Sequence, residues 1–182
     1  MYLRLFLILA MLCTFSSPAS AEPDLSTLQV DRSPAKNVSD LIKRCDLIAY
    51  GWIDSAYQSV PTRKVVRQGK VVNYVQKFQI KRSFKGTSAR SVKLLSTGVE
   101  PLPDAEDPIN MTYPGPLGEG NYLLFLRAVK GTDMYSITGI WQGVYPLHGG
   151  RTIALQGIGF AELNGLTLDQ IAQKIGSLHS RP

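Results

Sequence analysis

The sequence predicts a mainly β domain with a short helix before the strands and an amphipathic helix after them. Three observations support this fold class. About seven short segments are rich in β-forming residues, turn residues separate them, and helical periodicity occurs only before and after these segments. Many short strands with few helices are typical of a closed or nearly closed barrel, or of a sandwich.

The first 21 residues have the features of a secretory signal peptide. A positive charge precedes an apolar run at residues 5–12, and Ala19-Ser20-Ala21 is a small-x-small cleavage sequence. The apolar run is too short to cross a bilayer, so a retained membrane anchor is the less favoured alternative. We therefore expect an exported protein, periplasmic or extracellular, whose mature residues 22–182 contain one cysteine, Cys45.

The next residues predict an extended leader and a short helix. Residues 22–36 are polar, contain two prolines and show weak periodicity, which is typical of a leader. Residues 37–45 predict the helix, since Asn37 or Ser39 can accept a hydrogen bond from the free amides of the first turn. Cys45 falls on the apolar face of this helix, where it is most simply a small buried side chain.

The strand pattern begins after this helix. Residues 47–57 are rich in β-forming residues, with Gly51 as an expected bulge or bend. Residues 71–81 alternate between apolar and polar side chains, which predicts a half-buried antiparallel strand with Lys77 and Lys81 on its solvent face.

The second half of the chain predicts further short strands and a closing helix. Residues 98–120 contain five prolines and predict a loop, because proline removes hydrogen-bond donors from a sheet. Residues 121–129 are apolar on both faces, as in a central strand. The closing amphipathic helix has Thr167 as its expected N-cap. The remaining strands and this helix are expected at residues 91–96, 134–138, 141–147, 151–155 and 167–178.

Four segments resemble a group of small exported bacterial proteins of unknown function. They are DLIAYGWI at 46–53, FQIKRSFKG at 78–86, GNYLLFL at 120–126 and ITGIWQGVY at 137–145. The resemblance spans about residues 39–147 and implies an OB-like or netrin-like barrel, as in the tissue inhibitors of metalloproteinases. We expect residues 37–182 to form a single domain with this barrel. The resemblance rests on core and turn positions, so it implies a fold rather than an activity. Those inhibitors hold zinc through an N-terminal cysteine, whereas the expected mature N-terminus here is Glu22-Pro23.

Charge is distributed unevenly along this basic chain, whose formal net charge is +6. Ten basic residues and no acidic residue lie between Asp54 and Glu100. One interpretation is a basic sheet face that binds a polyanion, such as an envelope polysaccharide, a lipid surface or a nucleic acid. The other is that these side chains only solvate and protect exposed strands. The candidate ligand-binding residues are Lys77, Lys81, Arg82, Lys85 and, for an aromatic contact, Trp141.

Three functions follow in order of preference. The first is an exported, non-enzymatic binding or protein-interaction module, with an envelope protein as one class of partner. The second is the polyanion binder. The third is a cysteine-dependent enzyme, which would need the fold to bring Cys45 and His148 together. Residues 100–107 are acidic but lack the spacing of a calcium loop, so we expect no metal and no cofactor.

Overall fold

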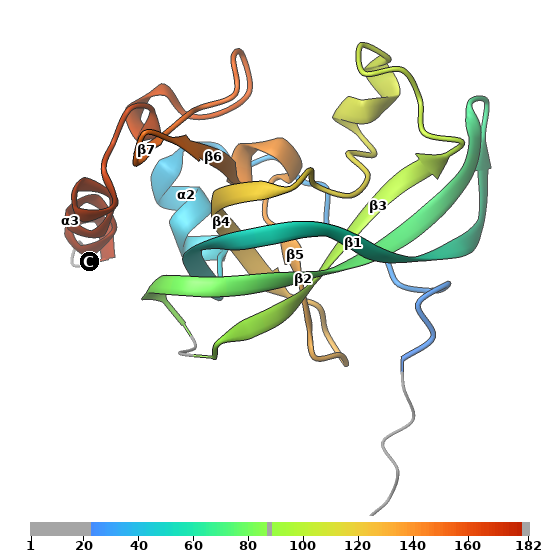
Figure 1. The fold of residues 1–182 in the computed structure, drawn as a ribbon, viewed down its shortest axis with the longest axis horizontal. Coiled ribbons are helices and arrows are strands. Elements are labelled where there is room, and N and C mark those ends of the chain that lie inside the picture. Colours follow the sequence, from blue (N-terminus) through green and yellow to red (C-terminus); the bar gives the residue numbers. More distant parts are fainter. Residues whose placement is uncertain (1–22, 87–88, 180–182) are drawn as a thin grey trace, which may run out of the picture.

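The described part of the chain folds into a mainly β structure with two α-helices at one end of it (Figure 1). The computed structural model describes residues 23–86 and 89–179. The expected signal peptide and its cleavage sequence lie outside the described residues. Within them, seven strands follow in order: β1 (Leu47–Val66), β2 (Gly69–Lys85), β3 (Ser91–Glu100), β4 (Gly120–Ala128), β5 (Met134–Ile137), β6 (Val144–His148) and β7 (Arg151–Thr152).

Five of the strands form a closed ring. The order around it is β1-β2-β3-β5-β4, and β4 pairs with β1 to complete it. The pair β3–β5 is parallel, and the other pairs in the ring are antiparallel. Strands β6 and β7 extend the sheet outward from β4. The predicted mainly β class is therefore confirmed.

The ring encloses an apolar core, and a second core lies beneath the helices. Inside the ring, the fully buried side chains include Ile53, Phe78, Leu94, Leu124 and Leu126. Beyond one end of the ring, α2 (Val38–Arg44) and α3 (Leu168–His179) pack on β4 and β6 through a cluster that contains Leu41, Ile48, Phe125, Tyr145 and Ile171. The long stems of β1 and β2 project from the other end as a hairpin (Figure 1).

Both helices begin where the sequence predicts. The side chain of Asn37 accepts a hydrogen bond from the backbone N–H of Asp40 at 2.8 Å, which caps α2. At α3, the Thr167 hydroxyl accepts from the Gln170 N–H, and the Gln170 side chain accepts from the Thr167 N–H. This reciprocal pair is a capping box.

Gly51 lies at a register shift between β1 and β2, so the irregularity that the sequence predicts at Gly51 as a bulge or bend is present, with the extra residue on β2. A Cβ atom at this position would collide with the carbonyl oxygen of Gln79, which explains why glycine occupies it. The shift also leaves Lys81 without a pairing partner on β1, because Ile80 pairs with Gly51 and Arg82 pairs with Tyr50.

Several strand boundaries differ from those that the sequence predicts. Residues 141–147 are not one strand: a 3-10 turn, η3 (Ile140–Gly143), precedes β6 because Gly139 and Ile140 both adopt positive φ. Strand β3 extends to Glu100, into the expected loop. That loop contains a 3-10 turn, η2 (Pro108–Met111), and another, η4 (Ala161–Leu163), follows β7.

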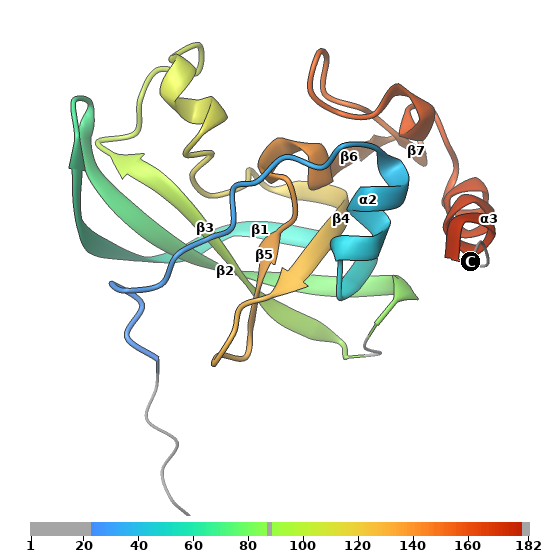
Figure 2. The same cartoon turned by 180° about the vertical axis from the view of Figure 1, so that it is seen from behind.

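The leader, residues 23–36, lies along the outside of the sheet and crosses β3 and β5 before it enters α2 (Figure 2). The side-chain amide of Asn73 donates to the carbonyl oxygens of Leu25 and Leu28, at 2.8 and 3.0 Å. Further along, Asp31 pairs with Arg44 and Arg127 at 3.3 and 2.9 Å. The leader is therefore fixed to the sheet at several points. No helix within residues 23–86 and 89–179 is long and apolar enough to cross a membrane.

Candidate functional site

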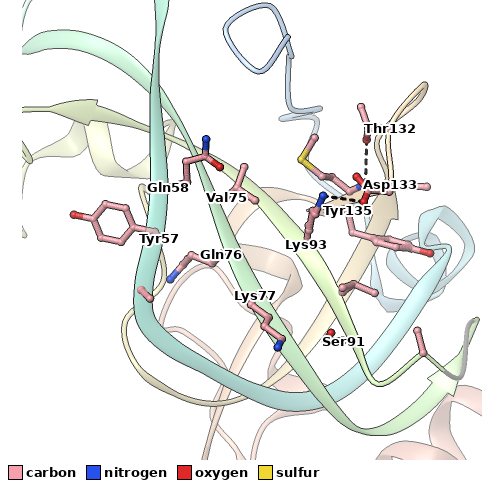
Figure 3. A pocket seen from close by; sticks show the side chains of 15 residues that line it. Tyr57, Gln58, Val75, Gln76, Lys77, Ser91, Lys93, Thr132, Asp133 and Tyr135 are labelled. Carbon is pink, nitrogen blue, oxygen red and sulfur yellow. Dashed lines mark hydrogen bonds and ion pairs between the residues drawn. The ribbon is translucent and has the colours of Figure 1, made fainter. Parts of the chain in front are cut away.

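A broad groove of about 940 Å³ lies on the outer face of the sheet, between β1 and the turn that joins β4 to β5 (Figure 3). Its floor comes from β2 and β3, where Val75 and Lys77 alternate with the inward-facing Gln76 and Phe78. Aliphatic and aromatic side chains dominate its lining, which includes Tyr57, Val75, Val92, Met134 and Tyr135.

An ion pair forms one wall of the groove. Lys93 Nζ lies 3.0 Å from Asp133 Oδ2, so the β4–β5 turn is linked to β3 (Figure 3). A hydrogen bond from Lys93, assisted by its positive charge, lowers the pKa of Asp133. Both side chains are more than half exposed, so the pair contributes little to overall stability.

Lys77 is the uncompensated charge of the groove. It lies directly opposite Lys93 in the β2–β3 register. Asp133 neutralises Lys93, whereas Lys77 forms no ion pair or hydrogen bond with any part of the chain that the structure describes. The groove therefore presents one free ammonium group beside apolar surface.

Tyr57 is an exposed aromatic group at the edge of the groove. It is 48% exposed, and its ring meets the buried Tyr74 edge to face at 5.3 Å. The Tyr74 hydroxyl in turn donates to Glu100 at 3.0 Å, and burial followed by this hydrogen bond raises the pKa of Tyr74. Tyr57 is therefore held against a fixed neighbour, and its ring points away from Lys77 (Figure 3).

The predicted site residues do not share one surface. Lys77 lines the groove, but the bulge turns Lys81 toward β1 and β4. There its ammonium donates to Asn121 at 2.9 Å and lies 5.7 and 5.5 Å from the ring centroids of Tyr50 and Trp52. The side chains of Tyr50, Trp52 and Lys81 thus form a separate small cation–aromatic cluster.

The other predicted site residues connect elements of the fold: Arg82, Lys85 and Trp141. Arg82 pairs with Asp169 of α3 at 2.7 Å, and Lys85 donates to the carbonyl oxygen of Ile42 at the end of α2 at 2.9 Å. The indole N–H of Trp141 donates to the carbonyl oxygen of Asn110 at 2.8 Å, and the ring is partly buried.

The features expected of a cysteine enzyme are not brought together. Cys45 is 2% exposed, and its thiol contacts the carbonyl oxygen of Leu41 and the hydroxyl of Thr138 at 2.9 and 3.4 Å. Burial raises the pKa of this thiol to about 11, so it is not a ready nucleophile. His148 is exposed at the end of β6. Among the described residues, no group of three or more His, Cys, Asp or Glu side chains could hold a metal ion.

Sequence reasoning missed Lys93, Asp133 and Tyr135 as groove residues. The parallel pairing of β3 with β5 brings residues 93 and 134 together, and no local pattern predicts that pairing. A scan against protein-family models and a search of curated proteins find no match for this chain. The functional argument therefore depends on the groove itself.

Proposed function

We propose that this chain is an exported, non-enzymatic binding module with an OB-like or netrin-like barrel, and that its ligand occupies the groove. The ring order, with its parallel β3–β5 pair, supports the fold part of this proposal. In OB folds, the face of the second and third strands and the loops beside it bind ligands. The groove lies on the corresponding strands and next to the β4–β5 turn.

The observation that carries the proposal is the free Lys77 ammonium beside the apolar side chain of Val75, which lies on the same outward face of β2. Ligand sites are concave and mostly apolar, with a few polar groups that fix orientation. A ligand that matches this groove has an apolar or ring-shaped part, which covers Val75 and the apolar side chains around it, and one acidic group, which reaches Lys77. A segment of a partner protein with an aromatic and an acidic side chain has both features.

Anilinonaphthalene sulfonate is a suitable probe, because it combines an aromatic ring system with one negative charge. We expect mature residues 22–182 to bind it saturably, and Val75→Ser and Lys77→Glu each to weaken the binding. Lys43→Glu is the matched control, since Lys43 is exposed on α2 and lies outside the groove. Equal probe affinity in all four proteins, with unchanged circular dichroism, would rule out the groove as the site.

The polyanion binder is the second candidate function, favoured by the uncompensated charge of Lys77 and the exposed ammonium of Lys81. Retention on heparin should then exceed retention on a plain sulfonate resin. Changing Lys77 and Lys81 to Glu and Arg82 to Gln should remove the difference. Glutamine is chosen at Arg82 because glutamate there would repel Asp169. Elution at the same salt concentration on both resins would mean that these side chains are ordinary surface charge and form no polyanion site.

A further inference from the structure

A second cavity, of about 340 Å³, lies on the same side of the sheet, nearer the tip of the β1–β2 hairpin. Three segments that are distant in sequence form it: the leader, the hairpin and the loop that follows η2. Its side chains include Arg32 from the leader, Arg63 and Lys64 from the hairpin, and Tyr113 from the loop. We refer to these four residues as the basic pocket.

Positive charge converges on one buried ring in this pocket. Tyr113 is 5% exposed and packs against Val71 and Val99. The guanidinium of Arg32 lies 4.8 Å from its ring centroid, and the ammonium of Lys64 lies 5.4 Å from it. Although burial raises the pKa of Tyr113, hydrogen bonds and positive charge from Lys64 and Arg32 outweigh that effect and lower it.

No carboxylate forms an ion pair with this cluster within the described parts of the chain. The six ion pairs found there involve none of Arg32, Arg63 and Lys64. Asp31, the neighbour of Arg32, is already paired with two other arginines. Asp24 interacts electrostatically with Arg63, but its carboxylate already accepts two hydrogen bonds from Ser26.

The pocket is also held in shape without a ligand. Asn73 fixes the leader before Arg32 through its bonds to Leu25 and Leu28. After Arg32, the backbone of Ala35 exchanges two hydrogen bonds with the side chain of Gln142, at 2.6 and 3.2 Å. The position of Arg32 opposite the hairpin is therefore preorganised, which reduces the entropic cost of binding.

We infer that the basic pocket binds a phosphate group, either as inorganic phosphate or as the terminal phosphate monoester of a larger molecule. Two guanidinium groups offer planar, bidentate donors, and an ammonium and a phenol hydroxyl add further donors. Three cations match the double negative charge of a phosphate monoester better than the single charge of a carboxylate. The assignment is independent of the ligand of the groove.

The test compares thermal shifts of mature residues 22–182 in sodium phosphate, glycerol 1-phosphate, sodium sulfate, sodium acetate and sodium chloride at one ionic strength. We expect saturable stabilisation by phosphate and by glycerol 1-phosphate that exceeds the effect of acetate and chloride. Arg32→Gln and Arg63→Gln should each weaken phosphate binding roughly tenfold, because each removes a charge-assisted contact. Arg67→Gln is the matched control, since Arg67 is exposed on the same hairpin but does not line the pocket.

Hydrogen exchange supplies a second readout that does not depend on global stability. A phosphate that joins Arg32 to the hairpin should slow exchange at leader amides 26–32 in the wild type and not in Arg63→Gln. If only glycerol 1-phosphate produces these effects, the ligand is the phosphate monoester of a larger molecule rather than inorganic phosphate. The inference is overturned if all five salts act alike, or if Arg32→Gln and Arg63→Gln respond to phosphate as Arg67→Gln does.

Discussion

The side chain of Gln76 forms two reciprocal hydrogen bonds with the backbone of Leu117. Its Nε2 donates to the Leu117 carbonyl oxygen at 2.9 Å, and its Oε1 accepts from the Leu117 N–H at 2.8 Å. Gln76 is 2% exposed on a strand whose other inward side chains are mostly apolar. This one polar residue thus fixes the end of the proline-rich loop to the ring.

Gln76→Ala should lower the free energy of unfolding by about 2–4 kcal/mol, because it creates a cavity and leaves two buried backbone groups unpaired. Urea unfolding monitored by circular dichroism measures this loss. Gln79→Ala is the control, since Gln79 is exposed on the same strand and should change stability by less than about 0.5 kcal/mol. Equal effects of the two substitutions would mean that the link to Leu117 contributes nothing.

Changing Lys77 and Lys81 together to Glu should alter the unfolding free energy by no more than about 1 kcal/mol. Lys77→Glu replaces a like-charge neighbour of Lys93 with an opposite charge. This gain offsets part of the cation–aromatic attraction that Lys81→Glu removes at Tyr50 and Trp52. Thermal unfolding at neutral pH checks this. A loss of several kcal/mol would show that one of these side chains is packed inside rather than exposed.

Cys45 should resist modification in the folded protein. Dithionitrobenzoate at pH 8 should react with it only after denaturant is added, since the thiol is buried and its pKa is raised to about 11. The raised pKa also gives a pH dependence. The neutral thiol favours folding fully below the unfolded pKa of 9.0, and this contribution is lost as pH rises from there toward 11.

The Cys45→Ala variant isolates that contribution. Its stability should fall less steeply between pH 9 and pH 11 than that of the wild type, although Tyr74 and Tyr145, whose pKa values burial also raises, retain part of the slope. Identical slopes would show that the thiol does not ionise on unfolding in this range.

Local patterns in the sequence predicted the elements of this fold better than their assembly. The caps at Asn37 and Thr167 and the irregularity beside Gly51 depend on a few neighbouring residues, so they could be located before the structure. The 3-10 turn at Trp141 was missed because positive φ at Ile140, a β-branched residue, has no sequence signal.

The candidate sites depend on contacts across the ring, and these set the limit of prediction. The run of basic residues could be seen in the sequence. In the structure these residues lie at the groove, at the aromatic cluster and beside the two helices. Which residue lies where follows from the bulge at Lys81 and from the pairing partners of β2. Arg32 and Tyr113 lie about 80 residues apart, and only the folded leader brings them to one pocket.

The Lys93–Asp133 pair offers a test of charge in the groove in which two substitutions act in opposite directions. Asp133→Asn leaves Lys93 uncompensated beside Lys77, so anilinonaphthalene sulfonate should bind about threefold more tightly. Lys93→Gln leaves Asp133 uncompensated, so the same anionic probe should bind more weakly by a similar factor.

The double variant Lys93→Gln/Asp133→Asn should bind the probe about as well as the wild type, because its net charge in the groove is unchanged. The wild type should also bind more tightly as pH falls through the lowered pKa of Asp133, whereas Asp133→Asn should lack this rise. Fluorescence titrations at low salt measure all four proteins, since screening weakens these effects at high salt. If both single variants moved affinity in the same direction, the probe would be sensing the position of the β4–β5 turn rather than the charge of the groove.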